Sequence, residues 1–330
     1  MRRIFFFFLL TGFLDSSAQT LSPRTDSSVS DRIVSWIDRY PDVHIAVDRP
    51  AHLRKGRPTR VLFYALPNGN TIEWTAGKTT GEQDDWHYDI QHIAAQTRYL
   101  RQTDRRCNYV TVYLMAKGKS WGAWRTLHAQ DKTRILPAIV DDMLRCFASY
   151  RPTAVLSSHS GGGYFLFEYI RAVDRIPDSI ERFVFLDSTY GYQDSLHVEK
   201  LTEWLLRKQK HRLCVTSYED ATVILNGKHI VSQAGGTWGR SFAMAADLGQ
   251  RLALRRGETD DFVYFDDAEK RVFFKLKKNP AGEIYHTVLV ERNGFIDTVQ
   301  EGTPKAERGY RFWGPRAYEK FIDDRAFRRP

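Results

Sequence analysis

Residues 154–173 read AVLSSHSGGGYFLFEYIRAV, and this stretch limits the folds that the rest of the chain can adopt. A short apolar run ends in Ser157-Ser158, a serine then stands between a histidine and three glycines, and a second apolar stretch follows with helical spacing. A short apolar run bounded by glycines is typical of a buried strand, and an apolar period near 3.6 residues is typical of a helix. The stretch therefore predicts a strand, a sharp turn over 159–163 and a helix.

The same alternation of strand-like and helix-like segments continues on both sides of this turn. We expect strands at Val43–Val47 (an edge strand), Arg60–Leu66, Asn108–Met115, Ala154–Ser157, Arg182–Leu186 and Leu213–Ser217. We expect helices at Asp31–Arg39, Asp89–Leu100, Leu136–Phe147 (with Pro137 in the first turn), Tyr164–Val173 and Val198–Lys208. Such alternation indicates a parallel sheet with helices on both faces. The predicted fold class is therefore α/β, a three-layer sandwich with a mostly parallel central sheet, in one domain over 31–330.

The C-terminal third is less regular. A helix is predicted at Phe242–Arg255, and Phe262–Phe265 with Val272–Leu276 is predicted as a strand pair. Residues Ile284–Ile296 fit either strand–turn–strand about Asn293-Gly294 or a loop followed by a helix. Periodicity alone does not decide between these two.

The N-terminus has the features of a targeting segment. A basic start, Met1-Arg2-Arg3, precedes a short apolar core and a small-residue site that ends at Ala18. This pattern predicts a secretory signal peptide over 1–18, with cleavage near Ala18. A retained membrane anchor is the alternative, but the apolar core is shorter than the roughly 20 residues that a span requires. We therefore expect an exported protein, periplasmic or secreted, whose residues 19–30 form a flexible lead-in.

The charge balance does not indicate a nucleic-acid partner. Cleavage after Ala18 removes two arginines and one aspartate, so the formal charge of +9 falls to +8, and the basic residues are spread along the chain. The densest basic runs, 207–212 and 275–278, carry no nucleic-acid motif and are interpreted as solvated faces. No stretch after the leader is long and apolar enough to span a membrane.

The chain has three cysteines, Cys107, Cys146 and Cys214, an odd number for an exported protein. Each has apolar neighbours, so buried free thiols are the expectation, and one disulfide remains possible without an assignable pair. No pair of cysteines or histidines has the spacing of a strong metal site, so neither a metal nor another cofactor is predicted.

The strand, the sequence Ser158-His159-Ser160-Gly161-Gly162 and the helix together resemble the nucleophile elbow of the α/β-hydrolase superfamily, whose usual form is G-x-S-x-G. Ser158 replaces the first glycine, which departs from the usual motif. The resemblance implies that Ser160 is the nucleophile and that the N–H of Gly161 is one donor of an oxyanion hole. A phosphate-binding loop is the alternative, but it would need Gly-Lys-Ser/Thr where Tyr164 stands.

The superfamily's chain order of serine, acid and histidine implies the other two members of a catalytic triad. Asp220 follows the second strand after Ser160 and is the preferred acid, while Asp187 ends the first and is the alternative. His286 is then the predicted base, because His229 lies too close to Asp220 in the sequence. His159 is next to the nucleophile and is predicted to line the substrate pocket.

The second oxyanion donor is implied to come from the loop after the strand RVLFYAL. Gly69 would permit a close approach of the backbone there, so that the N–H of Asn68 or Asn70 faces the site. A plain β-turn is the alternative, because Asn-Gly is a strong turn signal. Aromatic residues are frequent in the neighbouring loops, and Trp121 and Trp124 are predicted to line the substrate pocket.

These features favour an exported serine hydrolase that cleaves a carboxylic ester through an acyl-enzyme with a Ser-Asp-His triad. Its partner would be a small-molecule ester or acyl substrate. A serine peptidase or amidase on the same fold is the first alternative, and a non-catalytic envelope binding protein is the second. The natural substrate and the oligomeric state are left open by the sequence.

Overall fold

The computed structural model describes residues 26–29, 31–77, 91–232, 235–323 and 327. The predicted signal peptide, 1–18, and most of the predicted lead-in, 19–25 and 30, lie outside the described residues. Residues 26–29 do not form a lead-in without secondary structure, as the sequence suggested, because they pair as a strand with the segment that follows them.

In the described residues, one sheet of eleven strands forms the centre of the molecule, in the order β1-β2-β3-β5-β4-β6-β7-β8-β13-β12-β11. Pairing is parallel from β5 through β13 and antiparallel at the two ends of the sheet. The strands are β1 Asp26–Val29, β2 Arg32–Tyr40, β3 Val43–Pro50, β4 Thr59–Ala65, β5 Asn108–Ala116, β6 Pro152–His159, β7 Ile180–Leu186, β8 Arg212–Tyr218, β11 Leu254–Glu258, β12 Phe262–Asp267 and β13 Val272–Lys277. A separate hairpin joins β9 Ile224–Leu225 to β10 Lys228–His229.

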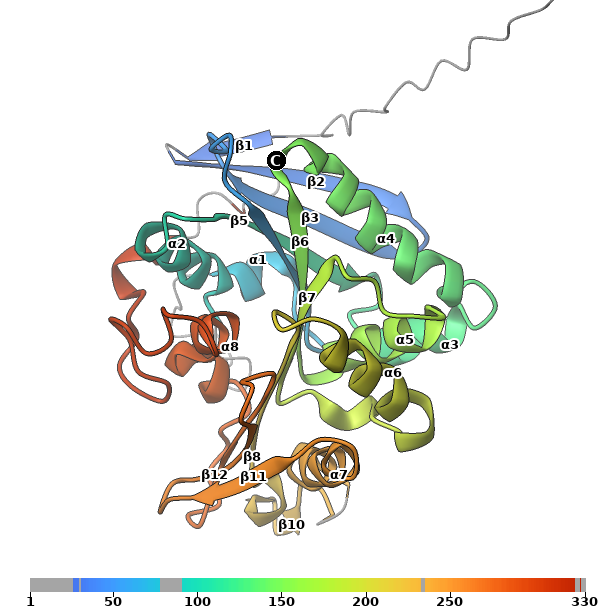
Figure 1. Ribbon diagram of the computed structural model, residues 1–330, viewed down its shortest axis with the longest axis vertical. Coiled ribbons are helices and arrows are strands. Elements are labelled where there is room, and N and C mark those ends of the chain that lie inside the picture. The colour runs from blue at the N-terminus through green and yellow to red at the C-terminus, as the bar shows by residue number, and fades with distance from the viewer. Residues whose placement is uncertain (1–25, 30, 78–90, 233–234, 324–326, 328–330) are drawn as a thin grey trace, which may run out of the picture.

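Helices cover both faces of the sheet. Figure 1 shows α2 and α8 on one side of the sheet, and α3, α5 and α6 on the other. The side chains of a central strand alternate between the two layers: Val61 and Phe63 of β4 belong to one hydrophobic core, and Leu62 and Tyr64 to the other. The helices are α1 Ile72–Ala76, α2 Ile93–Thr103, α3 Trp121–Leu127, α4 Lys132–Cys146, α5 Gly163–Ala172, α6 Asp194–Arg207, α7 Thr237–Gly249 and α8 Phe295–Gln300. The predicted three-layer sandwich is thus confirmed.

The central strands and the helices between them lie where the sequence predicts, but the prediction is wrong near both ends of the sheet. The predicted helix at Asp31–Arg39 is strand β2, and β3 is no edge strand because it pairs with β2 and with β5. Helix α4 begins at Lys132, so Pro137 lies inside it and not in its first turn. The predicted helix at Phe242–Arg255 is shifted: α7 ends at Gly249, and the segment from Leu254 is strand β11.

The two remaining ambiguities of the C-terminal third are resolved. Strands β12 and β13 pair antiparallel, which confirms the predicted strand pair. Residues 284–296 follow the second alternative, a loop followed by a helix, since the helical turns begin near Leu289 and continue into α8. All three cysteines are free thiols. Cys214 is buried, Cys107 is half-buried and Cys146 is exposed. None of the described helices is long and apolar enough to cross a membrane.

Candidate active site

Ser160 occupies a sharp turn between β6 and α5. Its φ is 53°, in the left-handed region that residues with a Cβ seldom adopt. The glycines after it permit this turn, because a Cβ at Gly162 would overlap the carbonyl oxygen of Ala65, and one at Gly163 would overlap that of Ser188. With glycine at positions 162 and 163, β6 and α5 therefore approach their neighbours more closely than a residue with a Cβ would allow. Ser160 itself is partly exposed between buried neighbours.

Asp187 and His286 form a hydrogen-bonded pair. Asp187 directly follows β7, has a φ of 45° and is fully buried. Its Oδ2 contacts Nδ1 of His286, whose side chain remains 27% exposed. The other carboxylate oxygen, Oδ1, accepts a hydrogen bond from the hydroxyl of Thr237 at the start of α7. Both oxygens of Asp187 are thus held, and the imidazole that it holds still reaches solvent.

Asp220 does not contact His286, which corrects the sequence-based preference for it over Asp187. It lies in the short turn after β8, where its Oδ2 accepts a hydrogen bond from the main-chain N–H of Thr237 at 2.7 Å and lies 3.2 Å from the Thr237 hydroxyl oxygen, whose proton goes to Asp187. Burial, together with the negative charge of Asp187, raises the pKa of Asp220 to about 6. Thr237 therefore lies between the two carboxylates, and of these two it is the Asp187 carboxylate that contacts His286.

His159 is not a pocket residue, as the sequence suggested, because its ring is completely buried. Its Nε2 lies 2.9 Å from the main-chain oxygen of His286, and since a carbonyl only accepts, Nε2 carries the proton. Its Nδ1 then accepts from the side-chain amide of Gln91 at 3.0 Å, and Gln91 accepts from the hydroxyl of Tyr64 at 2.6 Å. Burial and the neighbouring His286 ring lower the pKa of His159 well below its ordinary value. A neutral His159 therefore holds the main chain of His286 in place.

This contact brings His286 to the elbow. The rings of His159 and His286 are 4.5 Å apart between centroids, and His159 is the residue directly before Ser160. Within the described part of the chain, no hydrogen bond joins the Ser160 hydroxyl to the imidazole of His286. A hydrogen bond of this kind is often long in an enzyme without substrate and tightens when the substrate binds.

The loop after β4 lies directly over the turn at Ser160. A Cβ at Gly161 would overlap the side-chain amide of Asn68, so the two segments are in contact, as the sequence-based oxyanion hole requires. Gly69 has a φ of 83°, which suits a close approach, but its N–H donates to the carbonyl oxygen of Lys119 at 2.9 Å. Asn70 is buried. The N–H of Gly69 is therefore engaged elsewhere, and the candidate donors that lie in contact beside Ser160 are Gly161 and Asn68.

Trp121 and Trp124 lie in the core, which corrects their assignment to the substrate pocket. They are only 2% and 4% exposed and belong to the larger hydrophobic core. Their rings pack edge to face, and Trp121 also packs on Phe165 of α5. The two tryptophans thus support the helix that follows Ser160.

Three residues of this network were not singled out from the sequence: Tyr64, Gln91 and Thr237. Tyr64 is one apolar position in a buried strand, and Gln91 carries no motif. Thr237 follows Gly235-Gly236, a pattern that indicates only a turn. Among the described residues, no cluster of histidine, cysteine, aspartate or glutamate side chains has an arrangement that could hold a metal ion.

The strand order β2-β3-β5-β4-β6-β7-β8-β13, with β3 antiparallel to both neighbours and a strained serine after β6, is that of the α/β-hydrolase fold. The fold places a serine, a carboxylate and a histidine in the chain order Ser160, Asp187, His286 at one edge of the sheet. The class that fold and site define is therefore an α/β-hydrolase-fold protein with a candidate serine-hydrolase site.

Comparison with known proteins finds structural likenesses at low sequence identity. Neither a protein-family model nor a curated protein matches the sequence. Among solved structures, a thermostable esterase is 13% identical with a TM-score of 0.46, and the match covers 82% of this chain but only 63% of that esterase. The depolymerase LpqC of Bordetella parapertussis, which is named for poly(3-hydroxybutyrate), is 12% identical with a TM-score of 0.44, covering 81% of this chain and 88% of the other. A cold-adapted esterase from an Arctic intertidal metagenomic library is 11% identical with a TM-score of 0.40, covering 80% and 92%.

Proposed function

We propose that the protein is a serine hydrolase that cleaves carboxylic esters through an acyl-enzyme. The observation that carries the proposal is the Asp187–His286 pair, which is held beside a serine on a strained strand-to-helix turn. A buried carboxylate on Nδ1 fixes the imidazole in the tautomer whose Nε2 is free to accept a proton. A structural histidine has no need of this arrangement next to a strained serine.

In the proposed reaction, the Ser160 hydroxyl attacks the ester carbonyl while His286 Nε2 takes its proton. Asp187 stabilises the imidazolium that forms. The N–H of Gly161 at the start of α5 and a donor of the Asn68–Asn70 loop stabilise the negative oxygen of the tetrahedral intermediate. His286 then returns the proton to the leaving alcohol, and water releases the acid from Ser160 by the same steps in reverse.

An ester is favoured over an amide because an alcohol is the better leaving group and demands less of the acid that protonates it. We also propose that the protein is exported after cleavage near Ala18, in agreement with the basic and apolar N-terminus. N-terminal sequencing of the protein recovered from its native compartment tests this, and a chain that still begins at Met1 would contradict it.

The function is tested with three matched variants, Ser160→Ala, Asp187→Asn and Asp220→Asn. We expect Ser160→Ala to abolish both the hydrolysis of short p-nitrophenyl esters and labelling by a fluorophosphonate probe. Asp187→Asn should lower kcat by about 10⁴-fold, because the amide favours the wrong imidazole tautomer. Asp220→Asn should retain most of the activity, since its carboxylate does not touch His286.

The same assay separates the alternatives. Faster turnover of peptide anilides than of esters would favour a peptidase. No labelling of the folded wild-type protein would favour a non-catalytic binding protein. A loss of activity in Asp220→Asn with none in Asp187→Asn would refute the proposed triad.

A further inference from the structure

A cavity of about 450 Å³, open to solvent, lies at the N-terminal ends of the parallel strands, opposite the end of the sheet that carries Ser160. Its walls come from the first residues of parallel strands β4, β7 and β8 and from the segment before β5, whereas Ser160 follows the last residue of β6. The volume is within the range of small-molecule sites. This cavity takes no part in the proposed hydrolysis.

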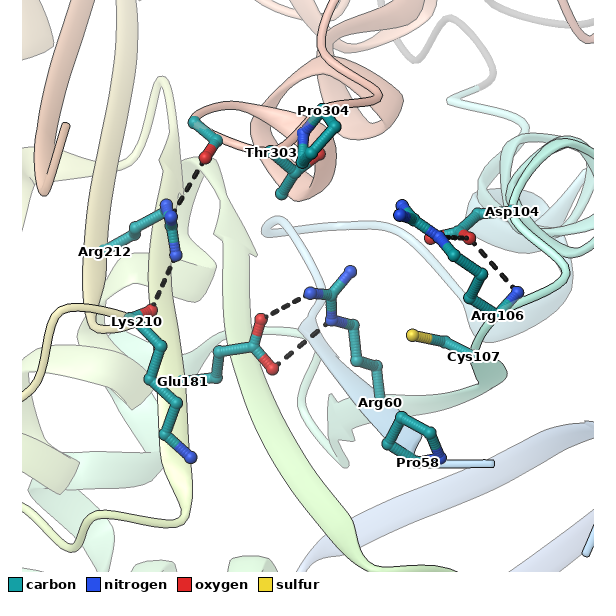
Figure 2. A pocket seen from close by; sticks show the side chains of 11 residues that line it. Pro58, Arg60, Asp104, Arg106, Cys107, Glu181, Lys210, Arg212, Thr303 and Pro304 are labelled. Carbon is teal, nitrogen blue, oxygen red and sulfur yellow. Dashed lines mark hydrogen bonds and ion pairs between the residues drawn. The ribbon is translucent and has the colours of Figure 1, made fainter. Parts of the chain in front are cut away.

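Two ion pairs in the wall are internally balanced, as Figure 2 shows. Arg60 binds Glu181 through both carboxylate oxygens, at 2.7 Å and 3.3 Å. Arg106 binds Asp104 at 3.1 Å. Each pair places one positive and one negative charge at the cavity, so neither leaves a net charge there.

Arg212 brings a positive charge that forms no ion pair with a carboxylate of the described residues. Within the part of the chain that the structure describes, its guanidinium donates to the main-chain oxygens of Lys210 and Gly302 alone, each at 2.9 Å (Figure 2). Its Nε is buried and, among the described residues, has no hydrogen-bond partner. Burial and the nearby Arg182 lower the pKa of Arg212. The surroundings of Arg212 therefore disfavour its protonated, positively charged form.

Arg182 does not line the cavity, but its positive charge acts on Arg212. It is fully buried and donates to the main-chain oxygens of Thr298 at 2.7 Å and Glu301 at 2.8 Å. In the described part of the chain, neither Arg182 nor Arg212 forms an ion pair with a carboxylate. Lys210 adds a further positive charge at the rim of the cavity. Buried charges without a counter-ion are costly, and a bound anion would relieve that cost.

We propose that this cavity binds a doubly charged oxyanion, the phosphate monoester group of a small organic molecule. A planar guanidinium matches phosphate oxygens with two parallel N–H donors. Four positive side chains (Arg60, Arg106, Lys210, Arg212) and two negative ones (Asp104, Glu181) line the cavity, a net charge of +2 that suits a dianion better than a single carboxylate. Pro58, Pro304 and the half-buried Cys107 form an apolar part of the wall. This part would accommodate the carbon portion of the ligand.

The test uses the full wild-type chain with phenyl phosphate at pH 8, compared with sodium chloride at matched ionic strength. We expect saturable binding of one phenyl phosphate per chain by calorimetry, and a rise in Tm that chloride does not produce. Bound phenyl phosphate should also slow modification of Cys107 by iodoacetamide, while the exposed Cys146 reacts at an unchanged rate.

Arg212→Gln should weaken binding by about tenfold or more, because it removes a charge-assisted donor. Arg255→Gln is the matched control, since that arginine is 69% exposed and pairs with Asp266 on β12. If Arg212→Gln does not fold, Lys210→Gln replaces it and should weaken binding more than Arg255→Gln does. Ser160→Ala should bind phenyl phosphate like the wild type, which separates this cavity from the proposed active site. No saturable binding, equal binding in the arginine variants, or protection of Cys146 instead of Cys107 would overturn the proposal.

Discussion

Ser160 and Asp187 share a backbone feature that a residue with a side chain seldom has. Both adopt positive φ, 53° and 45°, directly after parallel strands β6 and β7. A non-glycine residue held in this region costs on the order of 1–3 kcal/mol, and such residues cluster at functional sites. The strain turns both side chains out of the sheet at the same edge. We infer that the fold tolerates this cost because it brings the proposed nucleophile and the proposed acid close to His286.

The raised pKa of Asp220 has a consequence for stability. An aspartate has an ordinary pKa near 3.8, and the folded protein raises that of Asp220 to about 6, so between these values the folded state holds a proton that the unfolded state has lost. Its ionisation therefore destabilises the fold as the pH rises from about 4 to above 6. Asp220→Asn removes this charge and keeps an acceptor for the Thr237 N–H.

We predict that Asp220→Asn raises Tm at pH 8 relative to the wild type, and that the difference shrinks as the pH falls toward 4. Differential scanning fluorimetry from pH 4 to pH 8 measures it. The exposed Asp266→Asn is the control for a general effect of removing one carboxylate. A difference in Tm that stays constant, or that grows toward acid pH, would show that Asp220 is not the buried acid described here.

At the scale of elements, the turn from β6 into α5 depends on contacts between main chains. The Cβ of an alanine at Gly163 would collide with the carbonyl oxygen of Ser188, a backbone atom that cannot rotate away like a side chain. Gly249, the last residue of α7, provides a matched control because a Cβ there meets nothing within 4 Å.

We predict that Gly163→Ala lowers the free energy of unfolding by about 3 kcal/mol, the upper end of the usual cost of overpacking. Gly249→Ala should be neutral or stabilise by about 0.5–1 kcal/mol, because it removes glycine's entropy cost in a helix. Urea unfolding of both variants measures the contrast. Similar values for the two would contradict the close approach of β6, α5 and the β7 loop.

Strand β2 shows why an element at the end of the sheet escaped prediction. Its apolar residues Ile33, Val34, Trp36 and Ile37 fit a helical period as well as an alternating one. In the structure, Val34 and Trp36 face one core while Ile37 faces the other. Hydrogen bonding to β3 makes this segment a strand and not a helix. Strand β3 lies next to β2 because the chain turns at Pro41-Asp42. Periodicity within nine residues contains no information about that partner.

At the scale of the whole molecule, the three thiols differ in how deeply they are buried in the fold. Cys146 is exposed near the end of α4, Cys107 is half-buried before β5, and Cys214 is buried in the central strand β8. We predict that an aromatic disulfide reagent at pH 8 modifies Cys146 rapidly and Cys107 more slowly. Cys214 should react only at the rate of global unfolding, because its strand is covered on both faces.

Cys146→Ser should remove the fast phase and leave the other two unchanged. Addition of urea should accelerate the slowest phase in parallel with unfolding measured by circular dichroism. Rapid modification of Cys214 in the native protein would show that the sheet opens locally at β8.

The sequence by itself determined the α/β class, the order of the central strands and helices, and the turn at Ser160. These features depend on residues that are near one another in the chain. The apolar period predicts the strands and helices, and the run of glycines predicts a close approach of strand and helix at the turn. His286 was also predicted as the base, because the chain order implied by the resemblance leaves few histidines, and the structure places it against Asp187. All of this is local information or order along the chain.

Only the tertiary structure decided between Asp187 and Asp220, which follow neighbouring strands and are equivalent in chain order. The path of the loop that carries His286 selects Asp187, and the buried His159 and Gln91 hold that loop through contacts across 68 and 127 residues of sequence. The basic cavity at the opposite end of the strands likewise appears only when the first residues of separate strands are brought together. The physical reason is the same in each case. Contacts between segments far apart in the chain depend on how the whole sheet assembles, and no local pattern of residues encodes that assembly.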